Sequence, residues 1–62
     1  MTRKDYVKFA ELISANITTA GQFDPAAMDT IVQIAQDMVY IFADDNPNFD
    51  RYRFMAACGI ED

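Results

Sequence analysis

Histidine and tryptophan are absent from this chain, cysteine occurs once, and glycine and proline occur only twice each. Without histidine the chain lacks the commonest general base and a common zinc ligand. The lone cysteine, Cys58, rules out an internal disulfide, and two glycines cannot supply a glycine-rich phosphate loop. These absences predict that the protein is not an enzyme, has no catalytic residues, and holds no metal or cofactor.

One segment resembles the start of a calcium-binding EF-hand loop, because oxygen-bearing side chains alternate along it: Asp44, Asn46, Asn48 and Asp50. The match then fails, since Phe49 replaces the glycine of the sharp turn and Met55 replaces the bidentate glutamate. The end of one helix followed by the N-cap of the next explains the same residues. We therefore expect no calcium site here.

The chain has 62 residues, of which 52% are hydrophobic. This fraction is too high for a disordered acidic tail, and the length leaves room for a single domain over residues 1–62. A domain this small barely buries enough apolar surface to fold alone. A partner protein or a second copy of the chain is therefore expected.

No signal peptide and no membrane-spanning segment are visible in the sequence. The longest mostly apolar stretch, residues 26–43, is interrupted by Asp29, Gln33 and Asp37. We therefore predict a cytoplasmic protein that does not contact a membrane and keeps Cys58 reduced.

Positive charge is confined to the two ends of the chain, and no Lys or Arg occurs between Phe9 and Asp50. The formal net charge is −5. An acidic middle would repel a phosphate backbone, so direct binding to nucleic acid is not expected.

Apolar spacing and capping residues predict an all-α, three-helix bundle with helices over about residues 2–16, 25–44 and 50–58. Thr2 with Asp5 forms a capping-box pattern at the first start, and the β-branched run at 17–19 predicts that this helix fades near Asn16. Asp24 followed by Pro25 predicts the second start.

Asp50 and Gly59 bracket the third predicted helix as N-cap and left-handed C-cap, with Phe49 and Phe54 at the hydrophobic-staple positions. The second helix is apolar around most of its circumference. It is therefore predicted to be central, packed by the other two helices or by a second copy.

Three surfaces are candidate binding sites. The basic ends place arginines beside aromatic residues, a combination that protein interfaces favour, which predicts a partner-binding patch formed by Arg3, Lys4, Tyr6, Arg51, Tyr52 and Arg53. The polar strip of the second helix is an alternative acidic face, formed by Asp29, Gln33, Asp37, Tyr40 and Asp44. A seven-residue repeat on the same helix predicts an assembly face for a homodimer, formed by Ala27, Ile34 and Ile41.

Two of these surfaces also have a simpler explanation. The basic ends would neutralise the acidic middle of the folded chain, and a charged row on a helix is often only its solvated side. For the acidic face there is also a functional interpretation, because carboxylates in a row can imitate the phosphates of DNA.

Both ends of the chain resemble a known group of proteins. The opening MTRKDY and the closing DNPNFDRYRFMAACG are similar to small uncharacterised proteins of tailed bacteriophages and prophages, which pair such a start with an NPxFDxxxFxxACG ending. The similarity covers about a third of the chain. It implies a small phage accessory protein in the host cytoplasm that binds a host protein during host takeover or counter-defence.

The function expected from these observations is protein–protein binding that modulates or inhibits a host protein. The alternative is an acidic DNA mimic that blocks a nucleic-acid-binding protein.

Overall fold

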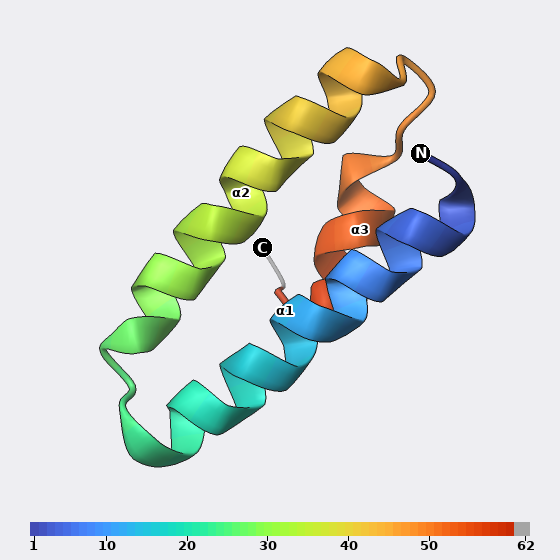
Figure 1. Cartoon of the computed structure of the whole chain (residues 1–62). Coiled ribbons are helices and arrows are strands. Elements are labelled where there is room, and N and C mark those ends of the chain that lie inside the picture. The colour runs from blue at the N-terminus through green and yellow to red at the C-terminus, as the bar shows by residue number, and fades with distance from the viewer. Residues whose placement is uncertain (61–62) are drawn as a thin grey trace.

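The computed structural model describes residues 1–60, and those residues form three α-helices without a strand: α1 (Arg3–Phe23), α2 (Ala27–Asp45) and α3 (Arg51–Cys58). α1 and α2 form a long antiparallel hairpin, and α3 lies against one end of it (Figure 1). All three pairs of helices pack, and α3 contacts α1 more extensively than α2. The predicted all-α three-helix bundle is confirmed.

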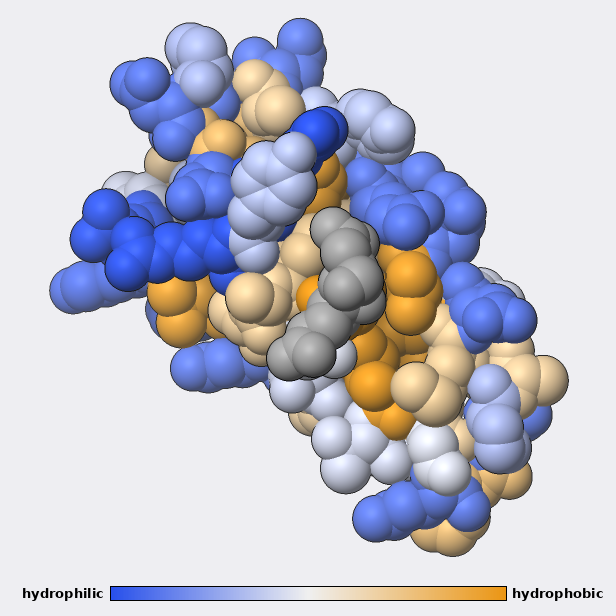
Figure 2. Space-filling view, turned by 180° about the vertical axis from the view of Figure 1, so that it is seen from behind, coloured by the Kyte–Doolittle hydropathy of each residue, from blue (hydrophilic) through white to orange (hydrophobic). Residues whose placement is uncertain are grey.

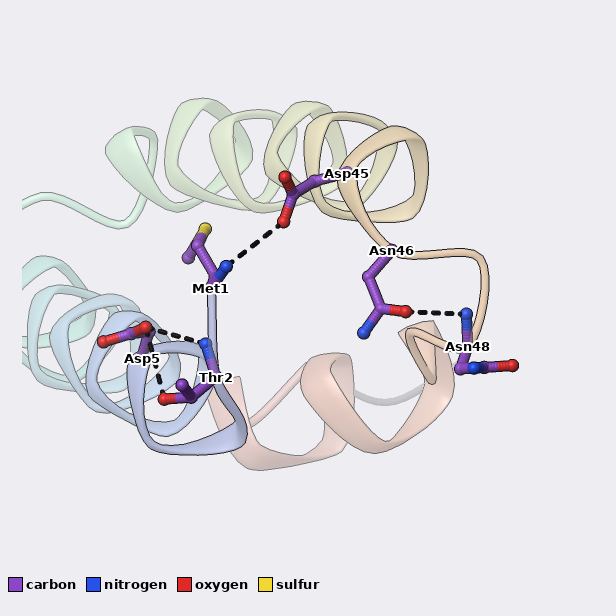
Figure 3. Close-up of polar contacts among 6 residues, drawn as sticks. All are labelled: Met1, Thr2, Asp5, Asp45, Asn46 and Asn48. Carbon is purple, nitrogen blue, oxygen red and sulfur yellow. Dashed lines mark hydrogen bonds and ion pairs between the residues drawn. The ribbon is translucent and has the colours of Figure 1, made fainter.

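The start of α1 carries the predicted capping pattern. The Thr2 backbone N–H donates to Asp5 Oδ2 at 2.8 Å, and the Thr2 hydroxyl donates to the same oxygen at 3.2 Å (Figure 3). These two bonds, the backbone one foremost, hold the pKa of Asp5 below its ordinary value. Asp5 thus fixes the first turn of α1.

The end of α1 corrects the prediction that this helix fades near Asn16, because it continues to Phe23. The Thr18 and Thr19 hydroxyls donate to the Ser14 and Ala15 carbonyl oxygens at 3.1 Å, so both are satisfied within the helix. β-branched residues cost only a few tenths of a kcal/mol each in a helix. Ile17 packs against the core and Ala20 is buried, and this packing outweighs that cost.

The start of α2 also differs from the prediction. Asp24 Oδ1 accepts from the Ala26 backbone N–H at 3.2 Å, which forms a turn containing Pro25, and regular helix begins at Ala27. The proline therefore precedes the helix instead of occupying its first position. At the other end, α2 stops at Asp45, one residue beyond the expected boundary.

The boundaries of α3 agree with the prediction. Asp50 Oδ1 accepts from the Arg53 backbone N–H at 3.1 Å. Gly59 adopts φ +85°, and the Ile60 N–H donates to the Met55 carbonyl oxygen at 3.0 Å. This is the closure of a left-handed C-cap, for which glycine is favoured because it lacks a Cβ.

The core is built around one aromatic side chain, Phe42 of α2, which is 4% exposed. Its ring centroid lies 5.0 Å from Tyr6 and 5.5 Å from Phe9, both on α1, and 5.3 Å from Phe54 of α3. Phe49 completes this aromatic cluster, 5.7 Å from Phe54, as the predicted staple requires. The rings therefore join all three helices at one end of the molecule.

α3 is too short to cover the whole hairpin. Its 8 residues extend about 12 Å, whereas α1 has 21 residues. Figure 2, viewed from the side opposite to Figure 1, shows apolar side chains gathered along the middle of that face and hydrophilic ones around its edge. The hairpin end away from α3 thus consists of two helices only.

α2 lies along one edge of the molecule, with α1 and α3 both on its inner side (Figure 1). Its inner side is buried through Ala35, Val39 and Phe42. α2 contacts both other helices, but the prediction that it is the central element is wrong. α1 packs more extensively than α2 does, and the side of α2 away from α1 and α3 remains exposed.

Candidate functional site

One candidate site is an open cleft of about 470 Å³ between the start of α1, the segment that joins α2 to α3, and α3 itself. We call it the α1–α3 cleft. Its lining combines two arginines, three aromatic rings, small apolar residues and short polar residues: Arg3, Tyr6, Val7, Ala10, Asn46, Asn48, Phe49, Asp50, Arg53, Phe54 and Ala57.

The aromatic cluster forms the inner part of this cleft. Phe49 lies between Tyr6, at 4.8 Å, and Phe54, at 5.7 Å between ring centroids. The segment before α3 is held in shape by Asn46, whose Oδ1 accepts from the Asn48 N–H at 3.0 Å (Figure 3). The walls are therefore formed by packed rings and a hydrogen-bonded turn.

The charges at the cleft are mainly positive. Arg3 and Arg53 are exposed, and neither guanidinium forms an ion pair with another of residues 1–60. Asp50 also lines the cleft, but one of its oxygens is engaged by the backbone of α3. Two arginines beside aromatic rings suit a ligand that carries both carboxylate and apolar groups.

Tyr6 carries a buried hydroxyl without a hydrogen-bond partner among the described residues. The ring contacts Phe42 and Phe49, so apolar groups surround it. An unsatisfied buried hydroxyl typically costs about 1–3 kcal/mol. This part of the cleft is therefore not optimised for stability alone.

The predicted basic-aromatic patch is only partly assembled. Arg3, Tyr6 and Arg53 line the α1–α3 cleft, whereas Lys4 is exposed and does not line it. Arg51 and Tyr52 line a second, more open depression between α2 and α3. Successive helical residues point about 100° apart, which separates this pair from Arg53.

The second depression, about 620 Å³, contains its own arginine–tyrosine pair. Arg51 Nη2 donates to the Tyr52 hydroxyl at 3.0 Å, and the guanidinium lies 5.0 Å from the ring centroid. Gln36 and Tyr40 of α2 line its opposite wall. Tyr40, a member of the predicted acidic face, therefore also lines this depression.

The predicted acidic face is exposed along α2. Its members share one side of the helix and all are solvent-accessible: Asp29, Gln33, Asp37, Tyr40 and Asp44. Gln33 Nε2 donates to Asp37 Oδ1 at 3.0 Å. None of the three aspartates forms an ion pair with another of residues 1–60.

The predicted assembly face is exposed over most of its length. Ile34 is 48% exposed and Ile41 is 64% exposed, whereas Ala27 is partly buried. The apolar row therefore faces solvent chiefly at its two isoleucines.

The groups with potential for metal or thiol chemistry have structural roles in this fold. Asn46 and Asp50 each use a side-chain oxygen to accept a backbone N–H, and residues 1–60 contain no cluster of three or more acidic or cysteine side chains arranged around a metal position. Cys58 is fully buried, and burial raises the pKa of its thiol. A buried, protonated thiol packs as a small apolar residue.

Sequence reasoning missed the contribution of the segment between α2 and α3. Asn46, Asn48 and Phe49 were assigned to a helix end and a staple, yet all three line the α1–α3 cleft. The staple pattern gave the available signal, because it places Phe49 against the first turn of α3.

Comparison with protein-family models, curated proteins and solved structures gives no match. None of the helices in residues 1–60 combines the length and the apolar character that crossing a bilayer requires.

Proposed function

We propose that this protein is a small binding module that modulates or inhibits a host protein by holding an acidic, partly apolar segment of that partner in the α1–α3 cleft. The observation that carries the proposal is the convergence of Arg3 and Arg53, from opposite ends of the chain, on one cleft with aromatic walls.

The chemistry of the cleft fits such a segment. Each guanidinium can donate two parallel hydrogen bonds to a carboxylate, and the rings provide apolar contact for the neighbouring side chain. The volume lies within the range of clefts that bind ligands. Arginine and tyrosine are also the residues on which binding energy concentrates in protein interfaces.

The resemblance to phage proteins supports the same site. Arg3 and Tyr6 lie in the MTRKDY-like start, and the cleft residues from Asn46 to Ala57 lie in the NPxFDxxxFxxACG-like ending. The two similar segments, separated by a variable middle, thus meet at one place. A phage accessory protein in the host cytoplasm would use this cleft for host takeover or counter-defence.

Selection from a display library of random 12-residue peptides tests the proposal without knowledge of the partner. We expect enriched peptides to carry Asp or Glu next to a large apolar residue. Arg3→Ala and Arg53→Ala should each weaken binding of a synthetic enriched peptide at least about tenfold, because a hydrogen bond to a charged group contributes about 1.5–3 kcal/mol and a tenfold change in affinity corresponds to about 1.4 kcal/mol. Titration calorimetry at two salt concentrations measures this.

The matched control is Lys8→Ala, which removes one exposed cation from α1 away from the cleft. It should leave peptide affinity within twofold. Enrichment of peptides without acidic residues, or equal affinity of the Arg53→Ala and Lys8→Ala variants, would refute the proposal. A tagged pull-down from the natural host, repeated with the same variants, then identifies the partner.

A second candidate function, an acidic DNA mimic, is favoured by Asp29, Asp37 and Asp44, three exposed aspartates of α2 that lack ion-pair partners among the described residues. It predicts that replacing Asp29, Asp37 and Asp44 with asparagine abolishes capture of a host protein that duplex DNA also displaces. Unchanged capture by the triple variant would eliminate it.

A further inference from the structure

The outer side of α2 carries an apolar row and an acidic row side by side. Ile34 and Ile41, seven residues apart, are 48% and 64% exposed. Asp37 and Asp44 repeat with the same spacing and are exposed. Seven residues correspond to about 10.5 Å, or two helical turns.

The two rows are close enough to act on one ligand. Asp37 lies three residues after Ile34 and four before Ile41, and such spacing brings Cβ atoms to about 5–6 Å. Gln33 bonds one oxygen of Asp37, and Asp44 forms no ion pair with residues 1–60. Each exposed isoleucine thus has a carboxylate beside it.

We propose that this side of α2 binds an amphipathic helix of another protein, whose apolar side contacts Ile34 and Ile41 and whose flanking Lys or Arg side chains pair with Asp37 and Asp44. A helix presents apolar residues at the same two-turn spacing, which is the usual basis of helix recognition by an apolar surface. The site lies on another side of the molecule from the α1–α3 cleft, and does not depend on it.

Charge decides between this partner and a second copy of the chain. No Lys or Arg occurs between Phe9 and Asp50, so two α2 helices placed face to face would bring aspartates together without cations from either helix. The Met1 amine, near the end of α2, already lies 3.4 Å from Asp45 (Figure 3). Like charges across an interface oppose association, whereas a basic helix supplies complementary charge.

Two synthetic 18-residue helical peptides with the same leucine positions test the proposal, one with lysines flanking the leucines and one with glutamates. We expect the lysine peptide to bind in titration calorimetry and the glutamate peptide to bind at least tenfold more weakly. The I34Q/I41Q variant should lose at least tenfold in affinity for the lysine peptide. The D37N/D44N variant should lose severalfold, with a smaller dependence on salt.

The controls separate lost contacts from lost folding. The I34L/I41L variant keeps the apolar area and should keep the affinity, and Glu11→Gln removes one exposed carboxylate from α1 without effect. Circular dichroism should show equal helix content throughout, because all the replaced side chains are exposed. Equal binding of both peptides would overturn the proposal. So would sedimentation of the wild-type chain as a dimer at micromolar concentration that the I34Q/I41Q variant loses.

Discussion

The two ends of this molecule are built differently. At one end three helices meet around Phe42, whose ring contacts aromatic residues of α1, α3 and the segment between α2 and α3. At the other end only α1 and α2 are present, Ala20 is buried outside the main core, and Phe23 is 81% exposed. We refer to these as the aromatic end and the turn end.

The comparison shows where a chain of 62 residues buries its large side chains. The turn end, built from two helices, leaves Phe23 exposed, whereas at the aromatic end a third helix of 8 residues helps to bury Phe42 and Phe54. The α1–α3 cleft lies at the aromatic end, where its walls are held by that packing. A preorganised wall reduces the entropy lost on binding.

The largest contrast is expected between two phenylalanine-to-alanine changes. Phe42→Ala removes a ring that is 4% exposed and should cost about 3–5 kcal/mol, enough to unfold much of a marginally stable domain. Phe23→Ala removes the same atoms at the turn end and should change stability by less than about 0.5 kcal/mol. Urea unfolding followed by circular dichroism measures both. Similar losses of stability for the two variants would contradict the proposed difference between the two ends.

The elements that sequence predicted well are those specified by local chemistry. Asp50 and Gly59 define α3 through hydrogen bonds within a few residues, and these bonds form as expected. The predicted end of α1 near Asn16 was wrong, because the low helix propensity of residues 17–19 was outweighed by packing within the folded hairpin.

The candidate site was less predictable for a related reason. Arginine and aromatic residues at both ends indicated a patch, but their grouping depends on how α3 packs against α1. That packing brings Arg53 to Arg3 and directs Arg51 toward α2. Helical spacing alone predicts that Arg51 and Arg53 point to different sides of α3. It does not predict which of the two lies on the side that faces α1.

Replacing each of the two glycines with alanine should change the stability of the protein in opposite directions, and so compares the two ends more sharply. Gly59→Ala, at the end of α3, forces a Cβ into φ +85° and should cost about 1 kcal/mol. Gly21→Ala lies inside α1 at the turn end, where the new Cβ meets Met28 Sδ at an ordinary 3.7 Å, and should gain about 0.5–1 kcal/mol in helix propensity. Thermal unfolding of both variants checks the signs. A loss for Gly21→Ala would indicate that this end is packed more tightly than described.

The smallest expected effect concerns the Tyr6 hydroxyl at the aromatic end. Tyr6→Phe removes a buried polar group without a partner and keeps the ring, so stability should stay equal or rise by up to about 1 kcal/mol. Urea unfolding measures the change. A loss above about 1 kcal/mol would mean that the hydroxyl has a partner in solution.

Binding at the aromatic end is tested most directly by nuclear magnetic resonance. An ¹⁵N-labelled chain would be titrated with the acidic peptide enriched by display. Amide shifts are expected at Arg3, Tyr6 and residues 46–57, with residues 20–30 of the turn end unaffected. Shifts confined to residues 20–30, or the same pattern in the Arg53→Ala variant, would contradict binding in the α1–α3 cleft.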